Sequence, residues 1–351
     1  MADKTSNRIE YLDLLKILAA FGVISGHIVC GSVPLVDMFS RDWHVFNLWQ
    51  SVYRWVLPVF FMCSGAIFLS KDPQIKKIYT KYIPRMLAAF LFWGVVYSVY
   101  STSEGSFWEY LSKILTGHFH MWYIPTMIGI YIALPLLRQI AKDDKLLKYF
   151  VILYLITAIA VPSLLTLASD FLAAGIAGKI STITYLLVKS SPSIVVGYVG
   201  YFMIGYYLAK TDFTKKERLI IYIVAIAGSI MTAVCSIGIA AKTGQSLETY
   251  YDTNTINIAL MSMGVFVWGR YNIKLPSKAS KVASFVAKYN FGIYLAHPLI
   301  IDILFFDLGM STFSFGNVLV GVVVMGLLVF ALCLIVSLIL SKIPVIGKYI
   351  V

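Results

Sequence analysis

Residues 12–30 read LDLLKILAAFGVISGHIVC, an apolar stretch that carries one lysine, Lys16, and one histidine, His27. Its length matches the roughly 20 residues that an α-helix needs to cross a membrane. Lys16 and His27 are eleven residues apart, so at about 100° per residue they share one helix face, separated by roughly 16 Å along the axis. Because ionisable side chains are costly inside a membrane, both residues are candidates for function.

Comparable apolar runs recur along the whole chain of 351 residues. Hydrophobic residues make up 59% and charged residues 13%, with a mean hydropathy of +0.82, which excludes a water-soluble protein of this length. We predict an all-α, polytopic membrane protein with about ten transmembrane helices and a single domain over residues 1–351. The expected helices cover residues 12–30, 49–69, 84–101, 120–137, 149–168, 193–209, 219–240, 255–269, 290–306 and 316–341. Segment 170–192 is partly apolar, which allows a re-entrant or interfacial helix.

The basic residues divide unevenly between the two sides of this arrangement. We let the two termini and the loops 70–85, 138–148, 210–218 and 270–289 face the cytoplasm. With Lys16 counted on that side, only six of the 29 lysines and arginines fall elsewhere. Lysine and arginine are enriched in the cytoplasmic loops of membrane proteins, so this distribution predicts that both termini are cytoplasmic. The net charge of +12 is then explained by basic loops on one side of a membrane, and it does not indicate binding to nucleic acid.

His27 is the first candidate for catalysis. An imidazole, whose pKa is ordinarily about 6.5, suits removal of a proton from a hydroxyl that attacks an acyl carbon. The alternative is a polar side chain that is hydrogen-bonded to a neighbouring helix. Lys16 either binds an anionic donor or extends to the membrane surface and marks topology. Asp13 precedes Lys16 by three residues, so we expect a structural ion pair between them.

The loop 71–85, KDPQIKKIYTKYIPR, concentrates positive charge on the predicted cytoplasmic side. Topology and attraction of anionic lipids account for most loops of this kind. The alternative is a clamp for the phosphates of a donor such as a coenzyme A thioester, formed by Lys77, Lys81 and Arg85. Arg85 follows Pro84 at the start of a predicted helix, where its guanidinium can face the bundle interior.

The opposite side of the predicted bundle is rich in aromatic and polar side chains. An aromatic belt at the membrane interface is one explanation, and a sugar-binding surface is the other, because sugar faces stack on aromatic rings. His118 and His120 lack a third ligand, so no metal is predicted, and His297-Pro298 is expected to mark a kink with a structural histidine. The residues expected to bind an acceptor are Arg54, Ser64, His120, Trp122 and Tyr123.

With these residues in view, the chain resembles the acyltransferase-3 family of integral membrane acyltransferases. That family has an Arg/Lys-x10-His pattern in its first helix, which Lys16 and His27 match, although lysine in place of arginine loses bidentate phosphate geometry. The resemblance indicates a stand-alone form without an SGNH domain. Further similar segments follow in family order: FFMCSG at 60–65, Arg85, HMWY at 120–123, YIALP at 131–135 and FGIYLAHP at 291–298.

The resemblance implies a membrane O-acyltransferase, and more narrowly an O-acetyltransferase, in the bacterial cytoplasmic (inner) membrane. Acetyl-CoA or another short acyl-CoA would be a co-substrate, with no tightly bound cofactor. The acceptor would be a hydroxyl of an envelope glycan, a lipid-linked saccharide or a similar molecule. His27 would be the base or a transient acyl carrier, while Lys16 and Arg85 would hold donor phosphates.

Two other functions fit the same sequence. A transporter or uptake domain for a small molecule such as an amino acid also uses intramembrane charges and helices broken by glycine or proline. A non-catalytic partner in envelope synthesis would tolerate replacement of His27, Lys16 and Arg85. The acceptor, the acyl group, the choice between direct and covalent transfer, and the oligomeric state stay open at the level of sequence.

Overall fold

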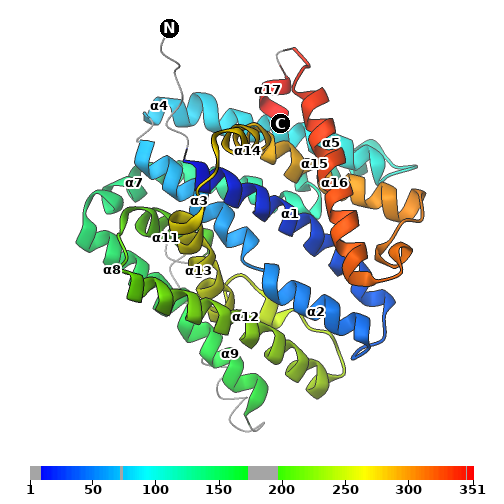
Figure 1. Cartoon of the computed structure of the whole chain (residues 1–351). Coiled ribbons are helices and arrows are strands. Elements are labelled where there is room, and N and C mark those ends of the chain that lie inside the picture. Colours follow the sequence, from blue (N-terminus) through cyan, green and yellow to red (C-terminus); the bar gives the residue numbers. More distant parts are fainter. Residues whose placement is uncertain (1–8, 72–73, 173–196, 345) are drawn as a thin grey trace.

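The computed structural model describes residues 9–71, 74–172, 197–344 and 346–351, and this part of the chain contains helices and loops but no β-strand (Figure 1). The longer α-helices are α1 (Glu10–Ser32), α2 (Arg41–Tyr53), α3 (Val56–Lys71), α5 (Ile83–Tyr100), α6 (Phe107–Thr116), α7 (Tyr123–Lys142), α8 (Asp144–Tyr154), α9 (Val161–Phe171), α11 (Tyr198–Lys210), α12 (Lys215–Thr243), α13 (Ile256–Asn272), α14 (Ser277–Lys288), α15 (Asn290–Asp302) and α16 (Val318–Leu340). Short helical turns are α4 (Ile75–Lys77), α17 (Gly347–Ile350), the 3-10 turns η1 (Val33–Leu35), η3 (Phe119–Trp122), η5 (Thr249–Tyr251) and η7 (Thr312–Phe315), and the π turns η2 (Ile78–Tyr82), η4 (Leu155–Ala160) and η6 (Ile303–Asp307).

Eight helical segments in the described part are long and apolar enough to cross a membrane, which confirms an all-α, multi-pass membrane protein. Several of them join two consecutive elements, for example α2 with α3 and α8 with α9. The segments are Glu10–Leu35, Arg41–Lys71, Ile75–Tyr100, Phe119–Lys142, Asp144–Phe171, Lys215–Thr243, Asn290–Asp307 and Val318–Leu340.

Two of the predicted membrane helices are short in the structure. α11 has 13 residues and α13 has 17, whereas a helix needs about 20 to cross the hydrocarbon core. Most of segment 170–192 and the first part of the predicted helix 193–209 lie outside the described residues. A total of about ten spans therefore stays a prediction.

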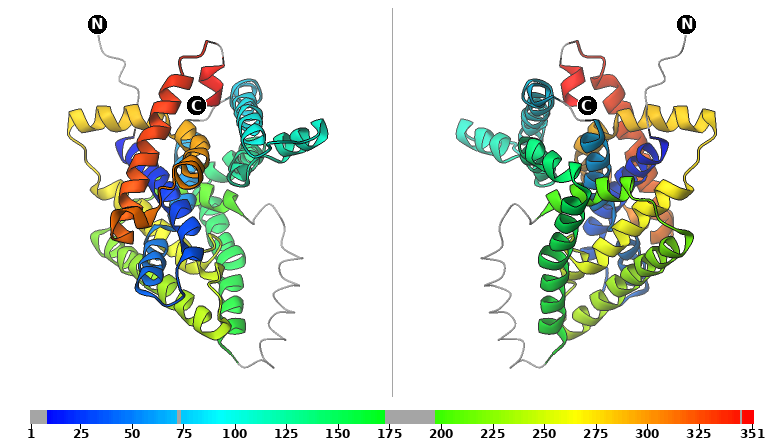
Figure 2. Two further views of the ribbon diagram at one scale, coloured as in Figure 1. Left: turned by 90° about the vertical axis from the view of Figure 1, so that its right-hand side faces the viewer. Right: turned by 90° about the vertical axis from the view of Figure 1, so that its left-hand side faces the viewer.

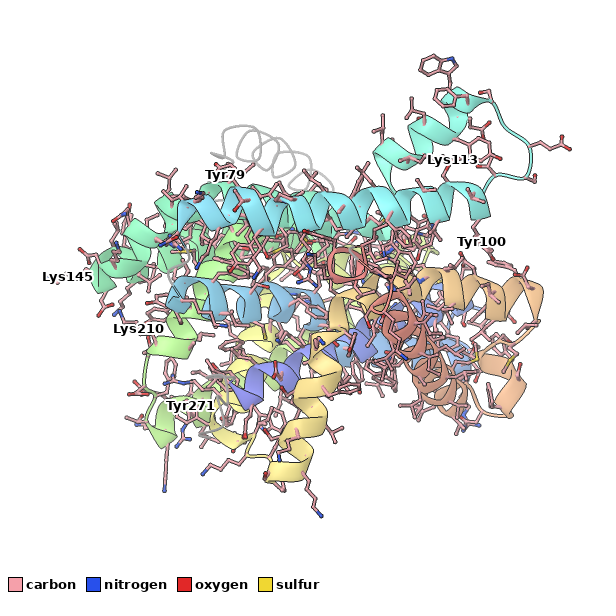
Figure 3. The ribbon with its side chains drawn as sticks, turned by 90° about the horizontal axis from the view of Figure 1, so that it is seen from above. Tyr79, Tyr100, Lys113, Lys145, Lys210 and Tyr271 are labelled. Carbon is pink, nitrogen blue, oxygen red and sulfur yellow. The ribbon has the colours of Figure 1, made fainter. Side chains whose placement is uncertain are left out.

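The structure gathers the predicted cytoplasmic loops at one end of the molecule. Lys210 forms an ion pair with Asp144, and Arg270 Nη2 lies 2.7 Å from Asp212 Oδ1, so three of these loops touch one another. We call the end with loops 70–85, 138–148, 210–218 and 270–289 the basic end. In Figure 3 the side chains toward the basic end are Tyr79, Lys145, Lys210 and Tyr271. The side chains toward the opposite end are Tyr100 and Lys113.

α1 runs through the interior of the bundle, where it contacts α2, α3, α13, α14, α15 and α16 (Figure 1). Two amphipathic helices, α6 and α14, project from the body instead (Figure 2). The central place of α1 puts both Lys16 and His27 among other helices rather than against lipid. It also makes this helix the frame of any site that they share.

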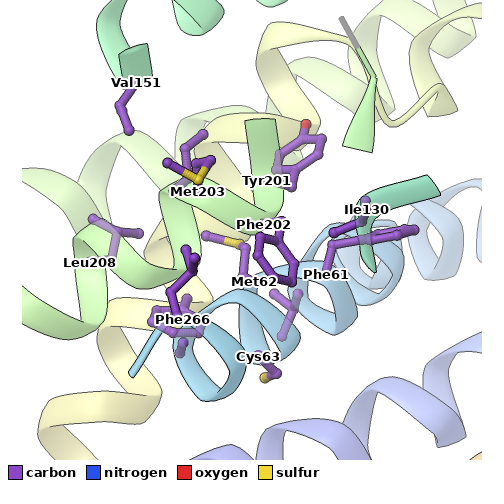
Figure 4. Packing of buried hydrophobic residues seen from close by; sticks show 14 of the residues in the cluster. Phe61, Met62, Cys63, Ile130, Val151, Tyr201, Phe202, Met203, Leu208 and Phe266 are labelled. Carbon is purple, nitrogen blue, oxygen red and sulfur yellow. The ribbon is translucent and has the colours of Figure 1, made fainter. Parts of the chain in front are cut away.

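Close approach of two helix backbones beside α1 depends on glycine. α3 and α11 pack together, with Gly65 against the backbone of Phe202 and Gly205 against the backbone of Met62. A Cβ atom at either glycine would collide with main-chain atoms of the other helix. Small residues allow such approach in membrane bundles, and large buried side chains, including Phe61, fill the space around the contact (Figure 4). The two glycines thus allow α11 to pack tightly on α3, which also contacts α1.

Candidate active site

A cavity of about 670 Å³ lies within the bundle and extends from the basic end toward the opposite end. Lys16 and Arg85 line it near the basic end, His27 lines its middle, and Arg54 lines it near the opposite end. α1 contributes both Lys16 and His27, which confirms that they face the same space. The volume is within the range of small-molecule sites, about 300–1,000 Å³.

Lys16 is held in place by two neighbours. Its Nζ lies 2.9 Å from Asp13 Oδ1, and its carbonyl oxygen accepts a hydrogen bond from Asn290 Nδ2 at 2.6 Å. The Lys16 side chain is 21% exposed, so the paired amino group still reaches the cavity. An ammonium with one carboxylate partner keeps further donors for an incoming anion.

Two more cations join Lys16 at the basic end of the cavity. Arg85 donates from Nη2 to the main-chain oxygen of Val351 at 2.5 Å, and its guanidinium carbon lies 5.6 Å from the centroid of the Phe291 ring. Lys288, at the last turn of α14, lines the same part of the cavity. Three helices, α1, α5 and α14, thus bring positive charge to one mouth.

Lys77 and Lys81 lie elsewhere. Both are exposed, on α4 and on the π turn η2, and neither lines the cavity. Their part in donor binding stays a prediction, and their exposure suits the alternative of attracting anionic lipid head groups.

His27 lies in the middle of the cavity wall. Its ring contacts Phe119 with centroids 5.3 Å apart and His297 with centroids 5.1 Å apart. No hydrogen bond joins the His27 side chain to another residue in the described part of the chain. The ring therefore makes no direct hydrogen bond to a neighbouring helix, and it faces the cavity, where a substrate can reach it.

A second group of histidines lies beside His27. His120 is 2% exposed, its Nδ1 lies 2.9 Å from Nδ1 of His118, and its carbonyl oxygen accepts a hydrogen bond from the Tyr294 hydroxyl. His118 stacks on Tyr97 with centroids 4.2 Å apart, and burial lowers its pKa. Over the residues with a described placement, no group of three or more His, Cys, Asp or Glu is positioned to hold a metal ion. The imidazole nitrogens of the cluster can donate and accept hydrogen bonds.

Arg54 reaches the cavity because the helix breaks at this residue. Arg54 and Trp55 separate α2 from α3, so the predicted helix 49–69 is two helices. Arg54 Nη2 lies 3.8 Å from Glu248 Oε1, and the guanidinium carbon lies 4.8 Å from the centroid of the Tyr251 ring. The break thus places a cation, a carboxylate and an aromatic ring together near the opposite end.

The remaining predicted acceptor residues also line the cavity. Ser64 does so with its hydroxyl bonded within its own helix, and Tyr123 does so with its ring 4.9 Å from that of Phe61. Trp122 is 39% exposed and lies 4.9 Å from Tyr198, which stacks on Phe61 at 4.4 Å. These rings form an aromatic surface that continues from the cavity to the exterior.

Several lining residues are absent from the sequence-based set. Glu248 and Tyr251 lie in the loop between α12 and α13, and Lys288 lies in a predicted cytoplasmic loop, where no local pattern marks them. Tyr294 and the adjoining His297 belong to the FGIYLAHP segment, whose family resemblance was a usable signal. Sequence alone assigned that histidine to a kink.

One comparison with known proteins identifies a family for this chain. A family model described as an acyltransferase domain, acyltransferase 3, matches residues 9–342. No curated protein and no solved structure matches the chain.

Proposed function

Because the chain belongs to the acyltransferase-3 family of membrane acyltransferases, we propose that it moves a short acyl group, such as acetyl, from acyl-CoA to a hydroxyl of an envelope glycan or lipid-linked saccharide. One observation carries the proposal: a single cavity is lined by cations at the basic end, by His27 in its middle and by aromatic rings toward the other end. A donor from one side of the membrane can meet an acceptor from the other. The bacterial cytoplasmic membrane is the proposed location.

The basic end suits coenzyme A, which is a polyanion. Lys16, Arg85 and Lys288 supply three charges from three helices, and phosphate oxygens accept charge-assisted hydrogen bonds from such groups. Arginine can also donate two parallel N–H groups to one phosphate, which lysine cannot do. The thioester then points inward toward His27. Acyl-CoA is a co-substrate in this scheme, and no tightly bound cofactor is involved.

His27 supplies the base. It removes the proton of the acceptor hydroxyl while the hydroxyl oxygen bonds to the acyl carbon. The carbon–sulfur bond then breaks, and the leaving thiolate takes the proton from the His27 imidazolium. Such proton transfer contributes typically 10²–10⁴-fold to a rate.

The opposite end suits a saccharide. Trp122 and Tyr123 offer ring faces for stacking, whereas Arg54 and Glu248 offer one donor and one acceptor for hydroxyl groups. The test is incubation of inside-out vesicles with radiolabelled acetyl-CoA, because their cytoplasmic face is accessible. Label in the envelope glycan fraction above that of vesicles lacking the protein is expected. Equal labelling would contradict the proposal.

Coenzyme A should also stabilise the purified protein. A ligand at 100 times its Kd raises the free energy of unfolding by about 2.7 kcal/mol, so thermal unfolding in detergent should shift upward with a non-hydrolysable acyl-CoA analogue. Free amino acids should leave the midpoint unchanged. Stabilisation by amino acids but not by the analogue would favour the transporter.

Lys288→Gln is expected to raise the KM for acetyl-CoA by about threefold to tenfold, because it removes one partly solvated phosphate partner. Lys281→Gln is the matched control, since Lys281 lies on the same helix and does not line the cavity. The measurement is the acetyl-CoA dependence of label transfer. Equal KM values for the two variants would remove Lys288 from the donor site.

A further inference from the structure

His297 has a defined tautomer because of the proline that follows it. Pro298 lies inside α15 and has no N–H, so the carbonyl oxygen of Tyr294, four residues earlier, loses its helical donor. His297 Nδ1 lies 2.5 Å from that oxygen. A carbonyl oxygen only accepts hydrogen bonds, so Nδ1 carries the proton and Nε2 carries a lone pair.

This lone pair is buried and unused. His297 is fully buried, and its Nε2 has no hydrogen-bond partner among the residues that the structure describes. Buried polar atoms are nearly always paired, so such an atom calls for an explanation. The titratable rings that face it are His27 on α1, with centroids 5.1 Å apart, and His120 on η3, with centroids 5.3 Å apart, with His118 behind His120.

We propose that His297 is a positioning residue for His27, whose ring N–H it accepts at Nε2 through one bridging water. The inference rests on the proposed function for its catalytic meaning, although not for its geometry. A hydrogen bond of this kind fixes one His27 nitrogen as the donor. The other nitrogen then faces the cavity without a proton, as a base requires.

The hydrogen bond also acts during the reaction. When His27 takes the proton of the acceptor hydroxyl, its imidazolium carries two N–H groups, and one of them donates through the bridging water to the His297 lone pair. The ring keeps its orientation until the leaving thiolate removes the new proton. His297 itself gains and loses no proton, which is the role that a neutral acceptor can fill.

If His297 only supported the Tyr294 carbonyl, the opposite result would be expected. Two substitutions, His297→Asn and His297→Gln, distinguish the two roles. In His297→Asn the side-chain NH₂ can replace Nδ1 and still donate to Tyr294, but nothing reaches the place of Nε2. In His297→Gln the longer side chain places an oxygen near Nε2, but the donor to Tyr294 is lost. One variant therefore keeps only the donor to Tyr294, and the other keeps only the acceptor at the place of Nε2.

The first readout needs neither donor nor acceptor: the rate at which diethylpyrocarbonate modifies His27, followed by mass spectrometry of the full-length protein in detergent. The unprotonated imidazole nitrogen attacks a carbonyl carbon of this reagent and becomes ethoxycarbonylated. We expect about tenfold slower modification of His27 in His297→Asn, and a rate within about threefold of wild type in His297→Gln. The second readout is kcat for acetyl transfer, which should fall in the same order while the KM for acetyl-CoA stays constant.

The reverse order, or equal rates in both variants, would overturn the proposal and leave His297 as a support of the Tyr294 carbonyl. Failure of wild-type protein to transfer acetyl groups would count against the proposed function alone, because modification of His27 is measured without substrate. Should either variant not fold, ¹⁵N-histidine spectra of the wild type, which has five histidines, decide the matter. His297 must then be protonated at Nδ1 and carry no proton at Nε2; any other tautomer overturns the proposal.

Discussion

His27→Ala is expected to lower the rate of acetyl transfer by about 10²- to 10⁴-fold, because it removes the general base that takes the acceptor proton. The side chain faces the cavity and makes no direct hydrogen bond to another side chain in the described part of the chain, so we expect the variant to fold. Label from acetyl-CoA in inside-out vesicles measures the rate. The KM for acetyl-CoA should change little, since the donor phosphates bind at the basic end.

His44→Ala is the control for this variant. His44 is exposed on α2 and does not line the cavity, so its replacement should leave transfer at the wild-type rate. His27→Gln keeps a polar side chain of similar length without a base, and it should be as inactive as His27→Ala. Transfer by either His27 variant at the wild-type rate would remove His27 from the mechanism and would favour a non-catalytic role.

The helical, multi-pass fold follows from the sequence because apolar runs in a membrane leave few alternatives to helices. The ends and breaks of those helices follow less well. The predicted helix 49–69 looks continuous, yet the chain turns at Arg54 and Trp55 and a separate α2 begins at Arg41. Pro58 lies four residues after Arg54 and has no N–H to donate to its carbonyl oxygen, so it accounts for the break, although a proline in an apolar run does not by itself predict two separate helices. Hydropathy also does not separate the short α11 and α13 from full spans.

The site was predictable where its residues share one helix. The spacing of Lys16 and His27 places both on one face of α1, whatever the rest of the chain does. His297 is more than 250 residues further along the chain, and only the packing of α15 on α1 brings it to His27. Lys288 was missed for a similar reason, because a lysine in a basic loop is ordinarily a topology signal.

Gly65→Ala is expected to destabilise the folded protein by about 1–3 kcal/mol or more, as overpacking does in tight interiors. A Cβ atom at Gly65 meets the carbonyl group and Cα of Phe202, which are main-chain atoms that cannot rotate away. α3 and α11 would have to separate, and the wall of the cavity that Ser64 lines would move with them. Thermal unfolding of the purified protein in detergent should show a clear drop in midpoint.

Gly129→Ala is the matched control, since it makes the same chemical change at another helical glycine. Nothing lies within 4 Å of a Cβ built at Gly129, and glycine lowers helix stability by about 1 kcal/mol relative to alanine. This variant should therefore unfold at or above the wild-type temperature. Because the two substitutions share their effect on helix propensity, their difference isolates the contact with Phe202. Equal stability of the two variants would mean that α3 and α11 do not approach as closely as Gly65 and Gly205 allow.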